Sequence, residues 1–164
     1  MTKPIPDGFS TITPHLIVPD AAKAIEFYKK ALGAQEQERF MMPDGKAVMH
    51  AQLKIGNSMV MLGNESPPTC LSPKSRGGTS VSLYLYVKDA DAAFENAVET
   101  GCTVKMPMSD QFWGDRYGQV EDPFGHQWSF ATHQEDLTAE QIAQNAKKFF
   151  AEMAKKRARE PVTA

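Results

Sequence analysis

The sequence predicts an α+β fold in which two tandem βαβββ modules form a cup-shaped mixed sheet, followed by a C-terminal helix. The first observation is an internal repeat, because residues 15–21 read HLIVPDA and residues 84–90 read YLYVKDA, 69 positions later. The second is that each copy leads into a helical apolar pattern that ends at a glycine, Gly33 or Gly101. The third is that strand-like segments follow each helix. Units that cannot bury their own apolar faces pair around one core, so we expect function in the cleft between them.

The first module is predicted to span residues 10–64. Residues 11–18 form an apolar run that is typical of a strand, and Asp20 is placed to cap the next helix by accepting a backbone N–H. Apolar residues then recur at helical spacing as far as Gly33. Turn residues separate three further predicted strands, at residues 35–42, 47–55 and 58–62.

Residues 65–78 are rich in Ser, Pro and Gly, which predicts a linker. The second module then repeats the order over residues 79–134, with a strand at 79–87 and a helix capped by Asp89 or Asp91. Its last three strands are expected at 102–106, 116–121 and 127–132. Asp122-Pro123-Phe124-Gly125 fits a type I turn before the last of them.

A C-terminal helix is expected over residues 137–158. Thr138 and Gln141 have the spacing of a capping box, and an apolar stripe follows at Ile142, Ala146, Phe149 and Met153. The stripe fits either this chain's own sheet or a second subunit, and the sequence leaves both open.

Composition narrows the classes of partner. The chain has 164 residues, 41% of them hydrophobic, and a formal net charge of −2, which gives no general attraction for nucleic acid or for anionic membranes. Basic residues do gather near the C-terminus, but they fit a solvated helix face; they are Lys147, Lys148, Lys155, Lys156, Arg157 and Arg159. Two distant cysteines, Cys70 and Cys102, predict neither a disulfide framework nor a zinc motif. With no apolar signal segment, we expect a cytoplasmic protein.

Several motifs together resemble one known group of proteins. They are the helix pattern Asp20, Ala24, Phe27 and Tyr28, the run Trp113 to Gly118 (WGDRYG), the run Asp122 to Trp128 (DPFGHQW), and the segment Ala131 to Asp136 (ATHQED). The combination is similar to the glyoxalase / bleomycin-resistance / extradiol-dioxygenase group, which has the vicinal-oxygen-chelate fold, and within it to the PhnB-like subgroup. The resemblance implies cups that hold small ligands and a homodimer. It does not imply one reaction.

The resemblance also implies where a metal would be bound. In the metal enzymes of the group, four His or Glu ligands come from the first and last strands of the two modules. The equivalent positions here are Thr13, Ser82, Ser129 and Met61, or Val60 if the register slips by one. Hydroxyl and thioether groups are poor ligands for divalent ions, so we predict no metal cofactor. The alternative is a shifted divalent metal at His15 and His50, which two neighbouring strands carry.

Strand alternation predicts the lining of the cup. Met49, Ala51, Leu53 and Ile55 should face the helix, which leaves His50 and Gln52 as ligand contacts, and the matching strand presents Tyr117 and Gln119. Arg116 would then point outward. The WGDRYG run nevertheless makes Arg116 and Trp113 candidates for holding an anionic substrate at the cleft mouth. The alternative is that Trp113 packs at the module junction and Asp115 pairs with Arg116. Seven methionines in the strands fit core filling, and Met61 in the cup would suit an apolar or aromatic ligand.

Two functions therefore remain from the sequence. The first is a metal-free, dimeric binding protein that sequesters a small aromatic or hydrophobic compound. The second is an enzyme on a small oxygenated substrate, lyase, isomerase or dioxygenase-like. It would use His15 or His50 as general base and Arg116 or Tyr117 to hold an oxyanion. The candidate ligand-binding residues are Thr13, His15, His50, Gln52, Met61, Ser82, Trp113, Arg116, Tyr117, Gln119 and Ser129.

Overall fold

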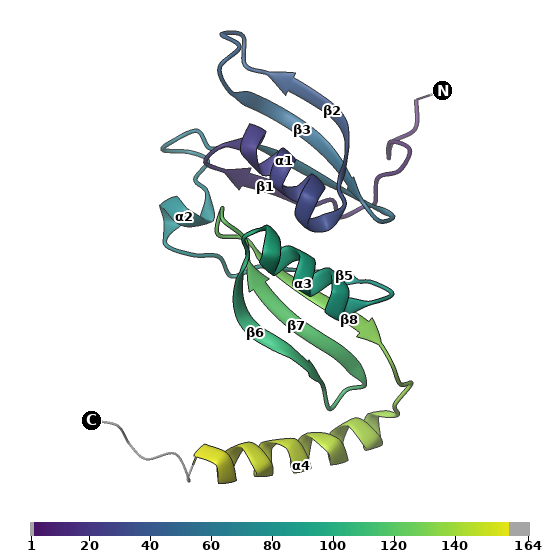
Figure 1. The fold of residues 1–164 in the computed structure, drawn as a ribbon. Helices are drawn as coiled ribbons and strands as arrows, with labels where there is room; N and C mark the ends of the chain where they lie inside the picture. Colours follow the sequence, from purple (N-terminus) through teal and green to yellow (C-terminus); the bar gives the residue numbers. More distant parts are fainter. Residues whose placement is uncertain (1, 158–164) are drawn as a thin grey trace, which may run out of the picture.

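The computed structural model describes residues 2–157 and confirms the α+β prediction (Figure 1). The first module contains β1 (His15–Val18), α1 (Ala21–Leu32), β2 (Gln35–Met41), β3 (Val48–Ile55) and β4 (Ser58–Asn64). A short helix, α2 (Pro73–Arg76), follows. The second module contains β5 (Ser82–Tyr86), α3 (Ala90–Thr100), β6 (Thr103–Asp110), β7 (Asp115–Glu121) and β8 (Gln127–His133). The last element is α4 (Ala139–Arg157). Of the predicted helix 137–158, residue 158 lies outside the described residues, as does Arg159.

Each module forms one four-stranded mixed sheet. The strand orders are β1-β4-β3-β2 and β5-β8-β7-β6, so β1 and β5 are both edge strands. The first strand pairs in parallel with the last strand of its module, and His15 lies opposite Met61 as Tyr84 lies opposite Ser129. This register makes Met61, rather than Val60, the counterpart of Ser129.

The helices begin and end where the sequence predicts. Asp20 and Asp89 cap α1 and α3, each by accepting a backbone N–H three residues later, at 3.1 and 2.9 Å. Asp91 does not cap α3, and its carboxylate binds Arg116 instead. The predicted capping box of α4 is reciprocal, because the Gln141 side chain accepts from the Thr138 N–H while the Thr138 hydroxyl accepts from the Gln141 N–H.

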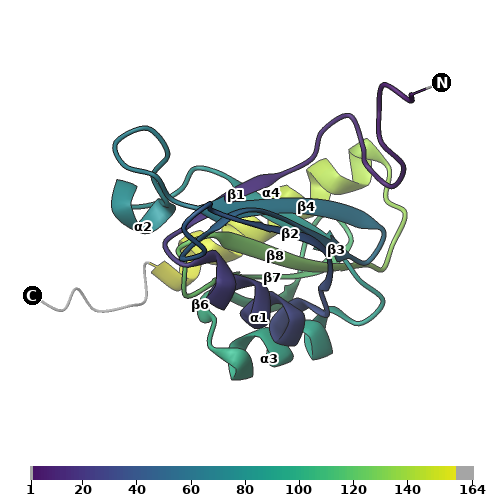
Figure 2. The same ribbon diagram turned by 90° about the horizontal axis from the view of Figure 1, so that it is seen from above.

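One core joins the two modules. Figure 2 shows α1 and α3 together on one side of the sheets, and their buried side chains form a single apolar cluster with the inner faces of both sheets. Across the junction, the Tyr28 hydroxyl of α1 donates to the Asp122 carboxylate at 2.7 Å. Asp122 also accepts from the Trp128 indole and from two backbone N–H groups of its own turn. The predicted turn is present, closed by the Gly125 N–H on the Asp122 carbonyl at 3.0 Å, and it also holds the modules together.

The predicted linker contains more structure than a loop, and the expectation for the strand methionines was wrong. The linker 65–78 contains α2 and a buried Ser72, whose N–H donates to the Glu65 carboxylate at 2.9 Å, so it is partly ordered by packing. The strand methionines are not mainly core residues, because Met41, Met42, Met49 and Met106 are exposed. Met49 breaks the expected alternation because a bulge in the β2–β3 pairing lets Val48 take the buried position.

Candidate functional site

The candidate site lies on the face of the second sheet opposite α3. The strands present alternate residues to the two faces, so Val120 is buried with the core while Tyr117 and Gln119 point to the other side. Helix α4 crosses this second face and encloses a pocket of about 560 Å³. Its lining is mostly apolar and consists of Tyr84, Met106, Ser109, Gln111, Phe112, Trp113, Tyr117, Phe149 and Met153.

Aromatic rings form a continuous wall around this α4 pocket. Phe112 meets Trp113 edge to face at 4.9 Å between ring centroids, and Trp113 meets Tyr117 at 5.8 Å. Tyr117 stacks on Tyr84 at 5.4 Å. From α4, the Phe149 ring lies 5.6 Å from Phe112, and Asn145 donates to the Phe112 carbonyl at 3.4 Å. The apolar stripe of α4 therefore packs on its own chain in this structure.

A polar cluster adjoins the aromatic wall at Tyr117. The Ser129 hydroxyl lies 2.8 Å from the Ser82 hydroxyl and 3.0 Å from the Tyr117 hydroxyl. The Gln119 amide nitrogen donates to both serines, at 3.1 Å to Ser82 and 3.3 Å to Ser129. Four of the predicted ligand-binding residues thus come together in one place.

Hydrogen counting shows what this cluster offers a ligand. The Ser129 oxygen has one hydrogen and two acceptor lone pairs, and Gln119 uses one of these lone pairs. Ser129 can then accept from only one of Ser82 and Tyr117 and must donate to the other. The hydroxyl that accepts from Ser129 keeps its own hydrogen free. The cluster therefore presents one uncommitted O–H donor, at Tyr117 beside the pocket or at Ser82.

The Asp115 carboxylate accepts hydrogen bonds from the polar groups of three aromatic side chains. It is 3% exposed, and one carboxylate oxygen accepts from the Trp113 indole at 3.1 Å, the Tyr86 hydroxyl at 3.1 Å and the Tyr84 hydroxyl at 3.3 Å. The other oxygen is 2.7 Å from His133 Nδ1. Burial alone would raise the pKa of Asp115, but the hydrogen bonds from His133, Tyr86 and Trp113 outweigh it and hold that pKa below its ordinary value.

Arg116 does not join the site. It lies on the α3 side of the sheet, where its guanidinium binds Asp91 at 2.7 Å and Asp110 at 3.3 Å. Neighbouring residues of a strand point to opposite faces, so Asp115 and Arg116 cannot pair as the alternative interpretation required. The outward orientation that strand alternation predicted for Arg116 is the one observed. Trp113 remains in the site because it lines the pocket.

The first module carries the remaining predicted residues on its corresponding face. The rings of His15 and His50 are 5.7 Å apart, and Phe40 stacks on His50 at 6.4 Å. Burial, and then the charge of His50, lowers the pKa of His15. Gln52 lies apart from the histidines, in a hollow of about 480 Å³ with Lys54 and Met59. Thr13 precedes β1, and its hydroxyl donates to the Ser10 carbonyl.

The donor set does not fit the metal site of the resembled enzymes. Ser82 and Ser129 bind each other, and Thr13 and Met61 supply only a hydroxyl and a thioether. Among residues 2–157, no three His, Cys, Asp or Glu side chains gather in a way that could hold a metal ion. Within the same range, no helix is long and apolar enough to cross a membrane.

Comparison with known proteins decides the family. The model of the Glyoxalase/Bleomycin resistance protein/Dioxygenase superfamily matches residues 9–130. The chain belongs to this superfamily. The match covers both βαβββ modules and ends before α4, so the aromatic pocket combines superfamily strands with a helix outside the matched segment.

Individual proteins also resemble this chain over most of its length. The protein Mb0911c of Mycobacterium bovis is 46% identical over 135 residues, which cover 80% of this chain and 88% of that protein. The crystal structure of TioX from Micromonospora sp. ML1 aligns with a TM-score of 0.61 and 28% identity over 76% of this chain and 98% of that one. The PhnB protein from Bacillus cereus shares the fold, with a TM-score of 0.58 and 16% identity over 75% and 99% of the two chains.

Sequence reasoning missed the part of the candidate site that α4 builds. Phe112 was not singled out, and Phe149 was named only as part of a stripe with two alternative partners. Tyr84 was noted only as the counterpart of His15, and Asp115 only as a partner for Arg116. The available signal was the concentration of Trp and Tyr around Asp115, since buried Trp N–H and Tyr O–H groups need acceptors.

Proposed function

We propose that the chain is a small-molecule-binding protein whose α4 pocket takes a planar aromatic compound that carries a hydrogen-bond acceptor. The observation that carries the proposal is the aromatic wall joined at Tyr117 to a cluster with one free O–H donor. A volume of about 560 Å³ is within the usual range for small-ligand sites, roughly 300 to 1,000 Å³.

The chemistry of the lining supports that ligand class. The Tyr84 hydroxyl and the Trp113 indole N–H both donate to Asp115, so these two residues offer ring surface to the pocket. Gln111 is likewise occupied, because its amide nitrogen donates to Ser109. Tyr117 is then the ring that can also give a hydrogen. A carbonyl or ether oxygen on a flat ring system satisfies both features, whereas a phosphate would find no cation among the lining residues.

Fluorescence quenching tests this function. The chain has two tryptophans, Trp113 in the pocket and Trp128 in the core, so a bound quinone should quench chiefly Trp113. The probe is 1,4-naphthoquinone, and naphthalene serves as the comparison ligand without an acceptor. We expect Phe149→Ala to weaken binding of both probes about tenfold, which corresponds to about 1.4 kcal/mol. Lys148→Ala alters the preceding residue of α4, an exposed side chain that does not line the pocket, and should change binding little.

Tyr117→Phe separates the hydrogen bond from the stacking. It should weaken naphthoquinone by several-fold and leave naphthalene unchanged, because only the quinone accepts the O–H. Equal weakening of both probes, or quenching that persists in Trp113→Phe, would exclude this pocket as the binding site.

We propose further that this site works without a metal ion, because the hydroxyl and thioether groups at the four positions of the family's metal ligands are poor ligands for a divalent ion. The competing function is a shifted-site enzyme, and the 5.7 Å approach of His15 and His50 is the observation in its favour. Metal analysis of tag-free protein decides between them. Stoichiometric zinc that disappears in His15→Ala would support the enzyme, while metal-free protein that still binds naphthoquinone would support sequestration.

We also propose that the chain forms a homodimer. The first module leaves apolar side chains uncovered on the face that bears His50, among them Phe40 and Met49. Sedimentation velocity measures the assembly directly. A two-fold mass that falls to the monomer in Met49→Lys supports this face as the contact, and a monomer at all concentrations refutes it.

A further inference from the structure

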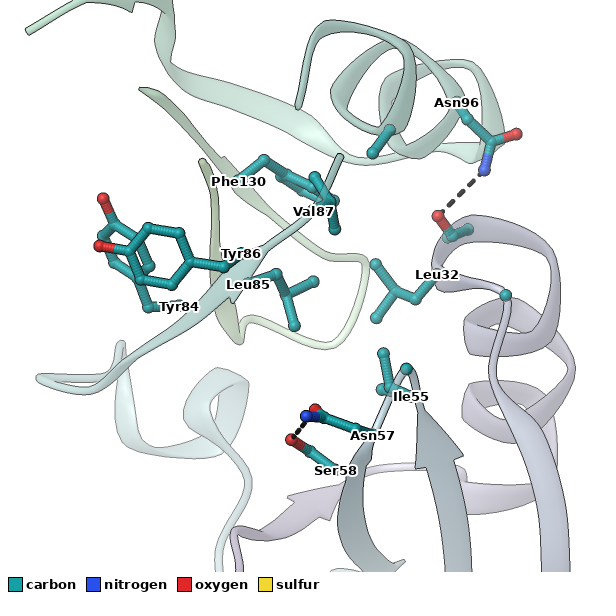
Figure 3. A pocket seen from close by; sticks show the side chains of 14 residues that line it. Leu32, Ile55, Asn57, Ser58, Tyr84, Leu85, Tyr86, Val87, Asn96 and Phe130 are labelled. Carbon is teal, nitrogen blue, oxygen red and sulfur yellow. Dashed lines mark hydrogen bonds between the residues drawn. The ribbon is translucent and has the colours of Figure 1, made fainter. Parts of the chain in front are cut away.

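The junction between the modules holds a second cavity that the proposed function does not use. It has a volume of about 600 Å³ and lies between the end of α1, the β3–β4 turn and the open edge of β5 (Figure 3). Leu32 and Ile55 face Leu85 across it, while the rings of Tyr84 and Tyr86 lie off to the other side of β5. Asn96 closes one end by donating to the Lys30 and Ala31 carbonyls of α1.

The open edge of β5 gives this cavity unpaired backbone groups. β5 pairs only with β8, and the Val87 N–H donates to the Ala131 carbonyl at 2.9 Å. Backbone groups alternate along a strand, so Tyr84 and Tyr86 direct their N–H and C=O away from β8, toward the cavity. Within residues 2–157, no side chain bonds these four groups. Unpaired backbone groups at an edge are the usual acceptors of an added strand-like partner.

The internal repeat shows how the corresponding edge of the first module is closed. In the first module, Ile17 of β1 occupies the position that Tyr86 occupies in β5. Its carbonyl lies 3.0 Å from His126 Nε2, and because a carbonyl only accepts, that nitrogen carries the hydrogen. The hollow beside it has a volume of about 260 Å³, less than half that of the β5 cavity.

The repeat also explains why the β5 edge is open. Met61 corresponds to Ser129 in the strand register, so the residue three before it, Ser58, corresponds to His126. Serine is too short to reach the edge, and its hydroxyl bonds Asn57 at 3.2 Å instead, as Figure 3 shows. His126 therefore fills the position beside β1, whereas Ser58 leaves a cavity at the corresponding position beside β5.

We propose that this junction cavity binds an N-acylated amino-acid amide with an apolar side chain. A residue of an edge strand offers its N–H and its C=O on the same side. A partner matches this residue when it carries an N–H and a C=O on the two sides of one saturated carbon, so that its C=O accepts from the strand and its N–H donates to it. The N–H and C=O of Tyr86 pair with that unit. Directly paired residues of two strands point to the same face, so the apolar side chain of the ligand packs against the ring of Tyr86, a lining residue of the cavity. This site shares only Tyr84 with the α4 pocket and does not depend on the function proposed for that pocket.

Amide-detected NMR of ¹⁵N-labelled protein tests the proposal. The probe is N-acetyl-L-leucine N-methylamide, and its control is the same compound with a methyl group on the leucine nitrogen. We expect the Tyr86 amide resonance to move and to saturate with the first probe. The N-methylated control should bind at least about tenfold more weakly, since it cannot donate to the Tyr86 carbonyl. A Tyr86 resonance that does not move, or equal shifts with both compounds, overturns the proposal.

Two variants locate the site. Ser58→His introduces at the β5 edge the residue type that closes the β1 edge, and it should abolish the response. Ser58→Ala should keep the response. The dispersion of each spectrum shows whether the variant is folded. Ser58→His that is folded and still binds the probe as tightly as the parent places the site elsewhere and refutes the assignment. Phe149→Ala should leave the response intact, which separates this site from the α4 pocket.

Discussion

Tyr28→Phe should destabilise the fold by removing a single buried hydrogen bond between the modules. The Tyr28 hydroxyl donates to Asp122 at 2.7 Å, and both residues are buried. The phenylalanine ring fills the same space, so no large cavity adds to the loss. A hydrogen bond to a charged group contributes about 1.5 to 3 kcal/mol, and Asp122 keeps its three other donors. We therefore expect the free energy of unfolding to fall by about 2 kcal/mol.

Differential scanning calorimetry measures this effect. For a chain of this length, about 1 kcal/mol lowers Tm by roughly 2 to 4 °C, so Tyr28→Phe should melt about 4 to 8 °C below the parent. Tyr86→Phe is the matched control, because it also removes a tyrosine–aspartate hydrogen bond but from a side chain that is 66% exposed. If the two variants melt at the same temperature, the reasoning about burial and the inter-module bond is wrong.

Three further predictions concern the α4 pocket and its supports. His133→Gln should reduce the pH dependence of stability: the hydrogen bonds that His133 donates to Asp115 and Asp136 raise the pKa of His133 above 6.5, so its contribution is complete below pH 6.5 and is lost as pH rises through the raised value. The lowered pKa of Asp115 places the opposite loss below pH 3.8, and urea unfolding between pH 4 and pH 9 would show the flattened alkaline limb. Gly114→Ala should cost more than about 2 kcal/mol, because Gly114 has a φ of 96° and its added Cβ would lie 2.5 Å from the Glu135 carbonyl oxygen. Gly45→Ala also has a positive φ but open space around it, so urea unfolding should show a smaller loss of about 1 kcal/mol. A chain ended after Asp136 lacks α4 and should stay folded yet lose naphthoquinone quenching; retained quenching would show that α4 is not part of the site.

The sequence predicted most of the architecture because its signals were local or repeated. Helix caps, turns and strand alternation each depend on neighbouring residues, and the 69-residue repeat placed Ser82 in the first strand and Ser129 in the last strand of the second module. The same alternation put Tyr117 and Gln119 on the cup side, where the structure brings all four together. It also gave Arg116 its outward orientation.

The remainder of the site could not be predicted because it depends on distant segments. Whether Phe149 packs on its own sheet depends on the path of residues 134–138, which no local pattern encodes. The role of Asp115 requires knowing that Tyr84, Tyr86 and His133, from two other strands, converge on one carboxylate. The exposed methionines were misread because hydrophobic composition alone does not distinguish a core from an uncovered face.

The carbonyl of Gly114 links the segment before α4 to the wall of the α4 pocket, which bears on how the pocket opens. It accepts the N–H groups of both Gln134 and Glu135, at 3.0 and 3.1 Å, so the segment that leads to α4 is attached to the residue next to Trp113. We therefore expect the helix and the indole wall to move together when the pocket opens. Under the proposed function, the residence time of a bound ring is set by the lifting of this unit rather than by the affinity of any single stacked pair.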